Sequence, residues 1–314
     1  MKSQAAATIL ETINHLVDHH QQLLNWRLAS LSDLKPAELA ELEKVWPKLT
    51  AKRRRQIVSR LVELAEDNVE LNFDGIFKSL LTDPDEEVRN QAIGGLWEEE
   101  APSLIEPLAR LLEQDSSTRV RAAAAAALAK FALLAEHQKL PASAAARVHQ
   151  ALLGTIGDDR QPAEVRRRAL EAVAPLSLPQ VAKTIRAAYC GHNAKLKISA
   201  IYAMGKSCDP CWLAILLDEL TSANAEMRYE AATACGELEA EAAVPHLSRL
   251  IDDADTEVQL AAIQALGKIG GNEAKKGLKR CLNHPREVTR QMAEQALEEL
   301  KDMEEPLSFG PEQW

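Results

Sequence analysis

Residues 252–271 read DDADTEVQLAAIQALGKIGG, and this stretch decides the fold because its pattern returns along the chain. Asp253 and Asp255 are short acidic side chains of the kind that cap free amides at the start of a helix. Apolar residues then recur at steps of three and four, the period of one helix face; they are Val258, Ala261, Ala262, Ala265 and Leu266. Glycines up to Gly271 end that helix, and a second helix follows toward Leu282. One unit of the pattern is therefore a helical hairpin.

The same pattern is present seven times between residues 80 and 300. Each copy has an apolar anchor near the start of its first helix; the anchors are Val88, Val120, Val165, Leu196, Met227, Val258 and Val288. They are spaced 32, 45, 31, 31, 31 and 30 residues apart, so only the second copy carries an insertion, with its expected turn at Lys139 to Pro141. A fixed period of about thirty residues is typical of a solenoid.

A hairpin of this length cannot bury its own apolar face, so successive hairpins must stack and share one continuous core. The sequence shows no alternating β-branched run of strand length. We therefore predict an all-α chain built as an α-solenoid.

The phrase DPxxxVRxxAxxALG resembles the first helix of HEAT repeats, and a second helix of matching type contains Ala243, Val244, Pro245, Leu247 and Leu250. The short period resembles the HEAT-like repeats of phycobilin lyases. This resemblance covers residues 80 to 300 and implies a right-handed solenoid of about seven hairpins behind a helical N-terminal cap. The phrases typical of tetratricopeptide and ankyrin repeats are missing.

A column of basic residues follows the anchors, at Arg89, Arg121, Arg166, Lys197 and Arg228. It resembles the arginine ladder of HEAT arrays, which implies that these side chains bridge acidic neighbours at the repeat junctions rather than bind a partner. The column ends at Gln259 and Thr289. The column therefore does not support identical stacking of the C-terminal units.

On this pattern the chain divides into a helical N-terminal cap (residues 1–80), the repeat array (81–300) and an acidic tail (301–314). The N-terminal part has amphipathic stretches without the repeat, as a unit that covers the end of a core would have. The tail carries Phe309 and Trp314 among prolines and carboxylates. Such a segment is typical of a flexible end. The alternative is a short linear motif that anchors in a groove.

The balance of charge is acidic, since 37 Lys and Arg face 47 Asp and Glu, a formal net charge of −10. A surface of this sign repels a phosphate backbone, so nucleic-acid binding is not expected. No apolar stretch approaches the ~18 residues of a membrane helix, and the N-terminus has no secretion signal. Five irregularly spaced cysteines favour free thiols. We expect a cytoplasmic protein without membrane contact.

A basic run stands at the start of a predicted helix, where positive charge is unfavourable for the helix dipole; it comprises Lys52, Arg53, Arg54 and Arg55. A solvated run on the cap is the simpler interpretation. The alternative is a docking element for an acidic partner, to which Trp26 and Trp46 would add apolar contacts.

Cys208 and Cys211 form a CxxC motif in which Asp209 is expected to cap a helix. Cys211 would then lie near the positive helix terminus, which stabilises a thiolate and makes a redox role physically possible. With Cys190 and His192 the pair would offer four zinc-compatible ligands. We expect an intervening helix of about 13 residues to hold the two pairs roughly 20 Å apart, too far for one zinc ion.

No other metal or cofactor site is expected. Glu11, His15 and His19 share one face of the first predicted helix, and exposed polar positions explain them without a metal. Deoxyhypusine hydroxylase-like proteins, which also have HEAT-like repeats, use His-Glu pairs as di-iron ligands, and no histidine here is followed by Glu. Nucleotide-binding and hydrolase motifs are missing. We predict that the chain is not an enzyme and has no cofactor.

The predicted function is a scaffold or adaptor that binds a protein or peptide through the solenoid surface. In HEAT arrays the second helices line the concave face, and the hypothesis that follows is that Arg110, Arg249 and Arg280 meet an acidic peptide there. A solvated position is the simpler interpretation of each. Trp314 is a fourth candidate contact, through the tail. The alternative is a lyase-like accessory protein that handles a cofactor, although no chromophore site can be carried over from that family.

Overall fold

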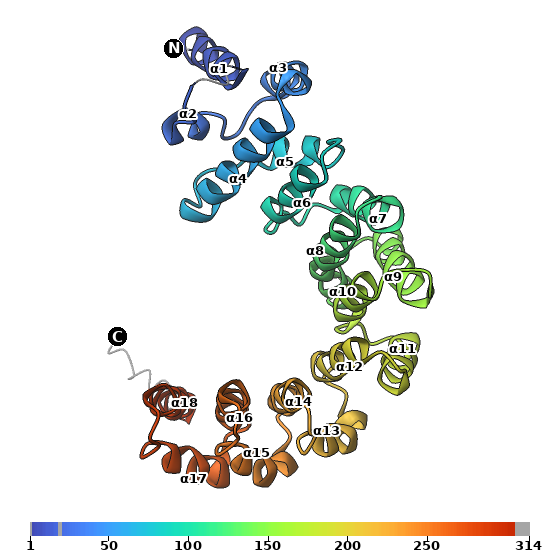
Figure 1. The fold of residues 1–314 in the computed structure, drawn as a ribbon, viewed down its shortest axis with the longest axis vertical. Coiled ribbons are helices and arrows are strands. Elements are labelled where there is room, and N and C mark those ends of the chain that lie inside the picture. Colours follow the sequence, from blue (N-terminus) through green and yellow to red (C-terminus); the bar gives the residue numbers. More distant parts are fainter. Residues whose placement is uncertain (1, 18–20, 305–314) are drawn as a thin grey trace, which may run out of the picture. The chain divides into compact units, whose positions relative to one another are not determined.

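The computed structural model describes residues 2–17 and 21–304. Over these residues the chain is all-helical, which confirms the predicted fold class. It divides into two compact units, Met1–Ala172 and Val173–Trp314. Each unit is built from helices that pack in two layers (Figure 1).

The helices of the first unit are α1 (Lys2–Val17), α2 (Asn25–Ala29), α3 (Pro36–Val45), α4 (Ala51–Asp67), α5 (Asp74–Leu80), α6 (Glu86–Gly95), α7 (Ile105–Gln114), α8 (Thr118–Glu136) and α9 (Ala142–Gly157). The next helix, α10 (Ala163–Val173), ends at the boundary between the units. The first helices α4, α6 and α8 pack in succession, while α5 packs on α6, and α7 and α9 pack on α8. Packing of α4 on α6 continues the layer of first helices toward the N-terminus beyond residue 80.

The helices of the second unit are α11 (Pro179–Cys190), α12 (Ala194–Lys206), α13 (Leu213–Glu219), α14 (Ala225–Glu237), α15 (Val244–Leu250), α16 (Thr256–Ile269), α17 (Gly271–Cys281) and α18 (Glu287–Glu304). The first helices α12, α14, α16 and α18 stack in order, and α11, α13, α15 and α17 cover them. Within this unit the second helices lie on the outer side of the bend (Figure 1), so the concave placement expected for them is wrong here.

The anchor residues of the repeat form the core, with one correction to their alignment. Val88, Val120 and Val258 are fully buried, as predicted. Val288 is 45% exposed, whereas Thr289 is 0% exposed. The last anchor is therefore Thr289, 31 residues after Val258, and the predicted spacing of 30 was wrong by one residue.

The arginine ladder is real and continues farther than the sequence predicted. Arg89 donates hydrogen bonds of 2.7 and 2.8 Å to the carboxylate of Asp115 and another to the carbonyl of Asp83, six residues before it. Arg228 does the same with Asp253 and the carbonyl of Ser222. These bonds tie each first helix to the loop before it and to the loop of the next hairpin, so these two arginines are structural.

The ladder does not end at Gln259. The Gln259 side chain donates to the carbonyl of Asp253, again six residues earlier. With the corrected alignment, the following member is Arg290, which donates to the carbonyl of His284 at 2.7 Å. Arg121 departs from the pattern because it bonds Thr118 of its own helix instead of an acidic neighbour.

The insertion lies where the spacing of the anchors predicted it. α8 and α9 have 19 and 16 residues. The turn between them includes Gln138, with a positive φ of 57°, and Pro141, which precedes α9. The extra residues therefore lengthen both helices of one hairpin. The division of the chain at residues 80 and 300 stays a prediction.

Candidate interaction surface

The second helices of the first unit carry a groove that contains Arg110. This groove, of about 520 Å³, lies beside the loop around Pro84 and has Pro107 and Leu111 in its wall. Arg110 is exposed at its edge and pairs with Glu106 of the same helix at 2.9 Å. Glu106 also accepts from Arg147, and the pKa of its carboxyl is lowered by both arginines. The charge of Arg110 is thus partly compensated.

A second groove, of about 410 Å³, adjoins the first because Thr82, Asp83 and Pro84 line both. Its apolar wall comes from Leu42, Trp46, Pro47 and Leu80. Asp83 is buried, accepts from the Trp46 indole at 2.7 Å and forms an ion pair with Arg54. Since cavities of roughly 300–1,000 Å³ accommodate small ligands, these grooves can each take one or two side chains of a bound segment.

In the second unit a groove of about 520 Å³ runs between α15 and α17 and contains Arg280 at its edge. Its walls include Val244, Pro245 and Ala274. Arg280 lies near Asp252, with 3.2 Å between the charged atoms. Arg249 is exposed on α15 but does not line this groove. The structure therefore places two of the three candidate arginines at grooves and leaves the third outside them. Trp314 lies outside the described residues.

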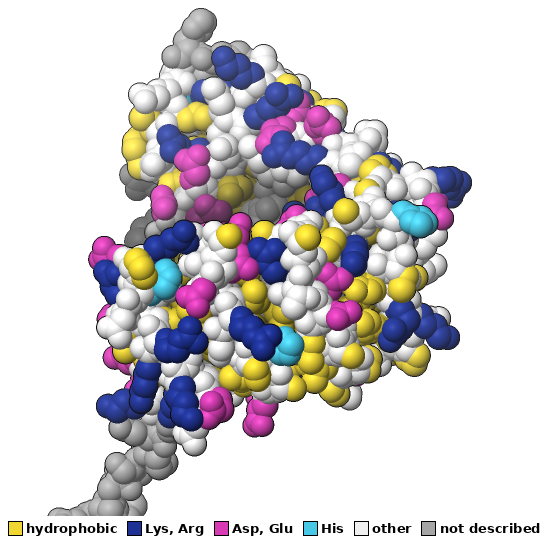
Figure 2. All heavy atoms as spheres, turned by 60° about the horizontal axis from the view of Figure 1, so that its bottom comes forward, with side chains coloured by type: hydrophobic (Ala, Val, Ile, Leu, Met, Phe, Trp, Pro, Cys, Tyr) yellow, Lys and Arg dark blue, Asp and Glu magenta, His cyan; other side chains and the backbone are white. Residues whose placement is uncertain are grey.

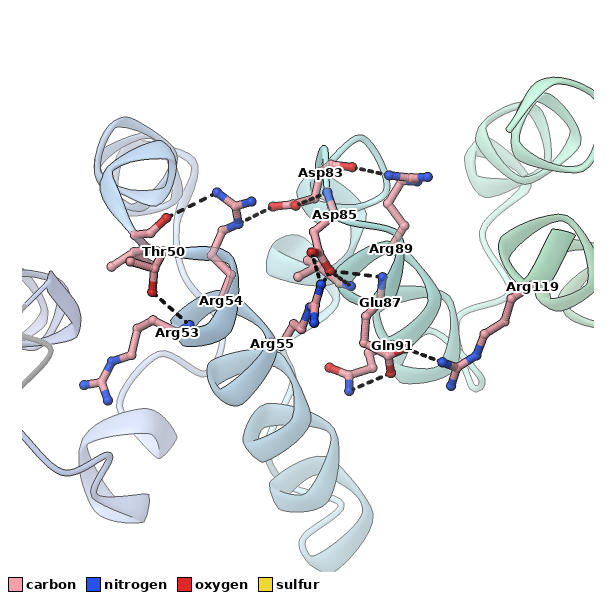
Figure 3. Close-up of polar contacts among 12 residues, drawn as sticks. Thr50, Arg53, Arg54, Arg55, Asp83, Asp85, Glu87, Arg89, Gln91 and Arg119 are labelled. Atoms are coloured by element: carbon pink, nitrogen blue, oxygen red, sulfur yellow. Dashed lines mark hydrogen bonds and ion pairs between the residues drawn. The ribbon is translucent and has the colours of Figure 1, made fainter. Parts of the chain in front are cut away.

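The arginines of the basic run at the start of α4 bind other residues of the same chain (Figure 3). Arg53 is buried and donates to the carbonyls of Leu16 and Gln21. Arg54 is buried beside Asp83. Arg55 makes two hydrogen bonds to Asp85, at 2.8 and 2.6 Å, and these lower the pKa of that carboxyl. Both sequence interpretations, a solvated run and a docking element, are therefore wrong for Arg53 and Arg54. Arg55 stays 51% exposed, so its pairing with Asp85 decides neither interpretation.

The CxxC motif has the predicted cap but not the predicted electrostatics. Asp209 accepts from the backbone of Cys211 at 2.9 Å and starts a 3₁₀ turn, Pro210–Trp212. The Cys211 side chain is exposed. The pKa of its thiol is nevertheless raised, first by partial desolvation and then by the hydrogen bond and charge of Asp209. Desolvation, and after it the Asp209 carboxylate, therefore oppose the thiolate that the sequence predicted at Cys211.

The four zinc-compatible side chains lie at opposite ends of one helix, as predicted. Cys190 ends α11, His192 lies in the turn before α12, and Cys208 and Cys211 follow α12. Within the described ranges, no three His, Cys, Asp or Glu side chains are grouped so that they could hold a metal ion. His19 falls outside those ranges, so the interpretation of Glu11, His15 and His19 stays a prediction.

Sequence reasoning missed a basic cluster on α17. Lys275, Lys276, Lys279 and Arg280 occur within this one helix, whereas Ala274, Gly277 and Leu278 form its buried face. Figure 2, in which the second helices of this unit are turned forward, shows Lys and Arg side chains gathered on this surface. The helical period would have revealed the cluster, but the acidic total of the chain concealed it.

Two layers of hairpins joined by a ladder of hydrogen-bonded side chains, among them Arg89 and Arg228, define an α-solenoid of the HEAT type. The family model of HEAT repeats matches residues 73–159 and 213–298, together more than half of the chain. The chain belongs to the HEAT-repeat family. No curated protein matches it in sequence. Among the described residues, no helix is both long and apolar enough to cross a membrane.

Solved structures share the fold at low sequence identity. A chain of the Kap95:Nup1 complex is 13% identical with a TM-score of 0.53, over 93% of this chain and 46% of that one. YibA of Escherichia coli is 16% identical with a TM-score of 0.47, over 81% and 98%. Human deoxyhypusine hydroxylase is 19% identical with a TM-score of 0.33, over 96% and 98%. At these identities the likeness concerns the fold alone.

Proposed function

We propose that the protein is a non-catalytic scaffold that binds segments of partner proteins in the grooves between its second helices. HEAT arrays in general serve as extended protein-binding surfaces. The observation that carries the proposal is the position of Arg110 and Arg280, each at the edge of a groove of about 520 Å³ with apolar walls. An exposed guanidinium beside an apolar groove suits a segment that carries both apolar and acidic side chains.

The test is affinity capture of the tagged, intact chain from extracts of its source cells, followed by mass spectrometry of the proteins retained. Charge reversal at the groove edges, Arg110→Glu and Arg280→Glu, should release a stoichiometric partner. Arg249→Glu is the matched control, because Arg249 is exposed on α15 outside the groove. A partner that is retained equally by all three variants would contradict a role for the grooves.

The same preparation tests the alternative function. Absorbance spectroscopy and elemental analysis would reveal a bound pigment or metal. A chain that carries such a group and retains no protein would overturn the scaffold proposal in favour of a cofactor-handling accessory protein.

A further inference from the structure

The outer face of α17 carries positive charge that its neighbours neutralise only weakly. Lys276 pairs with Glu273, but both side chains are 72% exposed. Arg280 and Asp252 are 61% and 64% exposed. Lys279 forms no ion pair with any residue that the structure describes. Pairs exposed to this degree contribute little, since water and salt screen them.

The ion pairs of the ladder, unlike those of α17, are shielded from solvent. Arg228 and Asp253 are 15% and 8% exposed and share two hydrogen bonds of 2.8 Å. Arg228 thus donates three hydrogen bonds within the repeat, from Nε and both Nη atoms, and its side chain is largely covered. The cations of α17 differ, since they project from the second-helix layer into solvent.

Gly277, in the lining of the groove beside these cations, lets α15 and α17 approach closely. A Cβ on Gly277 would lie 3.1 Å from the hydroxyl of Ser248 on α15. Val244, Pro245 and Ala274 add apolar wall, while Lys276 and Arg280 stand at the edge. An apolar side chain can therefore enter the groove while neighbouring carboxylates of the same segment meet the cations.

These features favour a protein segment over a nucleic acid. The groove lining contains no aromatic side chain on which a base could stack. Glu241 and Glu273 line the groove as well, and the chain as a whole has a net charge of −10. A continuous phosphate backbone would meet these carboxylates, whereas a peptide can place its acidic residues only opposite the cations.

We infer that the groove between α15 and α17 binds an extended acidic protein segment, with one apolar side chain in the groove and carboxylates on Lys276, Lys279 and Arg280. This inference rests on the proposed scaffold function and names the partner chemistry for one of its grooves.

The experiment measures binding of a fluorescein-labelled peptide by fluorescence anisotropy with the full chain. The peptide has about twelve residues, enough to span α17 when extended, with Glu on both sides of a central Leu. A peptide with Gln in place of every Glu and a single-stranded DNA of similar length are the comparison ligands. We expect the Glu peptide alone to bind, and added salt to weaken it.

The variant K276E/K279E/R280E should weaken binding of the Glu peptide about tenfold or more, since each edge charge contributes a modest factor. The control K44E/K48E/K52E makes the same change of net charge at exposed lysines of the first unit, and should leave binding unchanged within about twofold. Circular dichroism of both variants verifies that they fold.

Equal binding of the Gln peptide, an equal effect of the control variant, or tighter binding of the DNA would each overturn the inference. If the Glu peptide fails to bind while a captured partner still depends on Arg110, the scaffold function stands and only the acidic-segment inference falls.

Discussion

Gly205 on α12 lies directly against Ala234 on α14, where a Cβ on the glycine would be 2.7 Å from both the Cα and the Cβ of the alanine. The relationship recurs 31 residues later at Gly236 and Ala265, at 2.9 Å, and again at Gly267 and Ala296, at 3.1 Å. Glycine at this spacing lets the first helices of the second unit pack at close range. The stack therefore depends on the absence of a side chain at one position per repeat.

Replacing Gly205 by Ala should destabilise the protein, because the obstructing atoms belong to a helix backbone and cannot move aside. We expect Gly205→Ala to lower the free energy of unfolding by about 1–3 kcal/mol, despite the better helix propensity of Ala. Gly154 in α9 has no atom within 4 Å of such a Cβ, so Gly154→Ala should stabilise by about 0.5–1 kcal/mol. Urea unfolding measures the change in the free energy of unfolding for both variants. A change of the same sign in the two would contradict the close packing of α12 on α14.

Three residues at a spacing of 31 end first helices with positive φ: Cys208 (50°), Glu239 (48°) and Gly270 (67°). Only glycine adopts this conformation without strain. We expect Cys208→Gly and Glu239→Gly each to raise the free energy of unfolding by about 0.5–1 kcal/mol. Gly270→Ala should lower it, since its Cβ would also meet Leu300 at 3.1 Å. Thermal melting of the three variants checks the prediction, and a destabilised Glu239→Gly would contradict it.

The ladder pair Arg228 and Asp253 should make stability depend on pH. The hydrogen bonds from Arg228 lower the pKa of Asp253 in the folded chain. A lowered carboxyl pKa contributes stability above the unfolded value of about 3.9, and that contribution is lost as pH falls through the folded pKa. Arg228→Met should therefore cost about 1–3 kcal/mol at pH 7 and less below pH ~3. Urea unfolding across this range measures the difference, which would stay constant if the pair were not coupled.

Cys211 is exposed, yet it should react slowly with alkylating agents at neutral pH, because partial desolvation and the Asp209 carboxylate raise the pKa of its thiol. Asp209→Asn removes that negative charge and should accelerate alkylation of Cys211 several-fold. Burial raises the pKa of Cys235 to about 12 and of Cys281 to about 11, so these two should stay unmodified in both proteins. Mass spectrometry of timed iodoacetamide reactions reads this out, and rapid labelling of Cys211 in the unchanged protein would revive a redox role.

The hairpins and their stacking could be predicted because they depend on local periodicity and on the need of each apolar face for a partner. It could not be predicted that Thr289, rather than Val288, is the buried anchor of the last unit, since sequence alone favours burial of the valine. Which helix face turns inward is decided by the packing of α18 on α16 and α17. The basic cluster on α17 was missed for another reason. The net charge of the whole chain sums all its residues and does not show that basic residues gather on one helix.

In the basic run of α4, the helical period assigns each residue separately to a buried or an exposed face of the helix. Arg53 and Arg54 precede Ile57 and Val58 by four positions, so they lie on the buried stripe of the helix. Lys52 lies off that stripe and is exposed. The run thus looks like one surface feature in the sequence, yet its members belong to different faces.

Arg53→Ala should therefore destabilise the chain, because Arg53 connects α4 to the carbonyls of Leu16 and Gln21. Removing the guanidinium leaves these acceptors without that donor, at a cost of about 1–3 kcal/mol. Lys52→Ala is the neighbouring control and should change the free energy of unfolding by less than about 0.5 kcal/mol. Urea unfolding compares the stability of the two variants. Equal free energies of unfolding would contradict a structural role for Arg53. A partner contact would show the reverse pattern, with stability preserved in Arg53→Ala and capture of the partner lost.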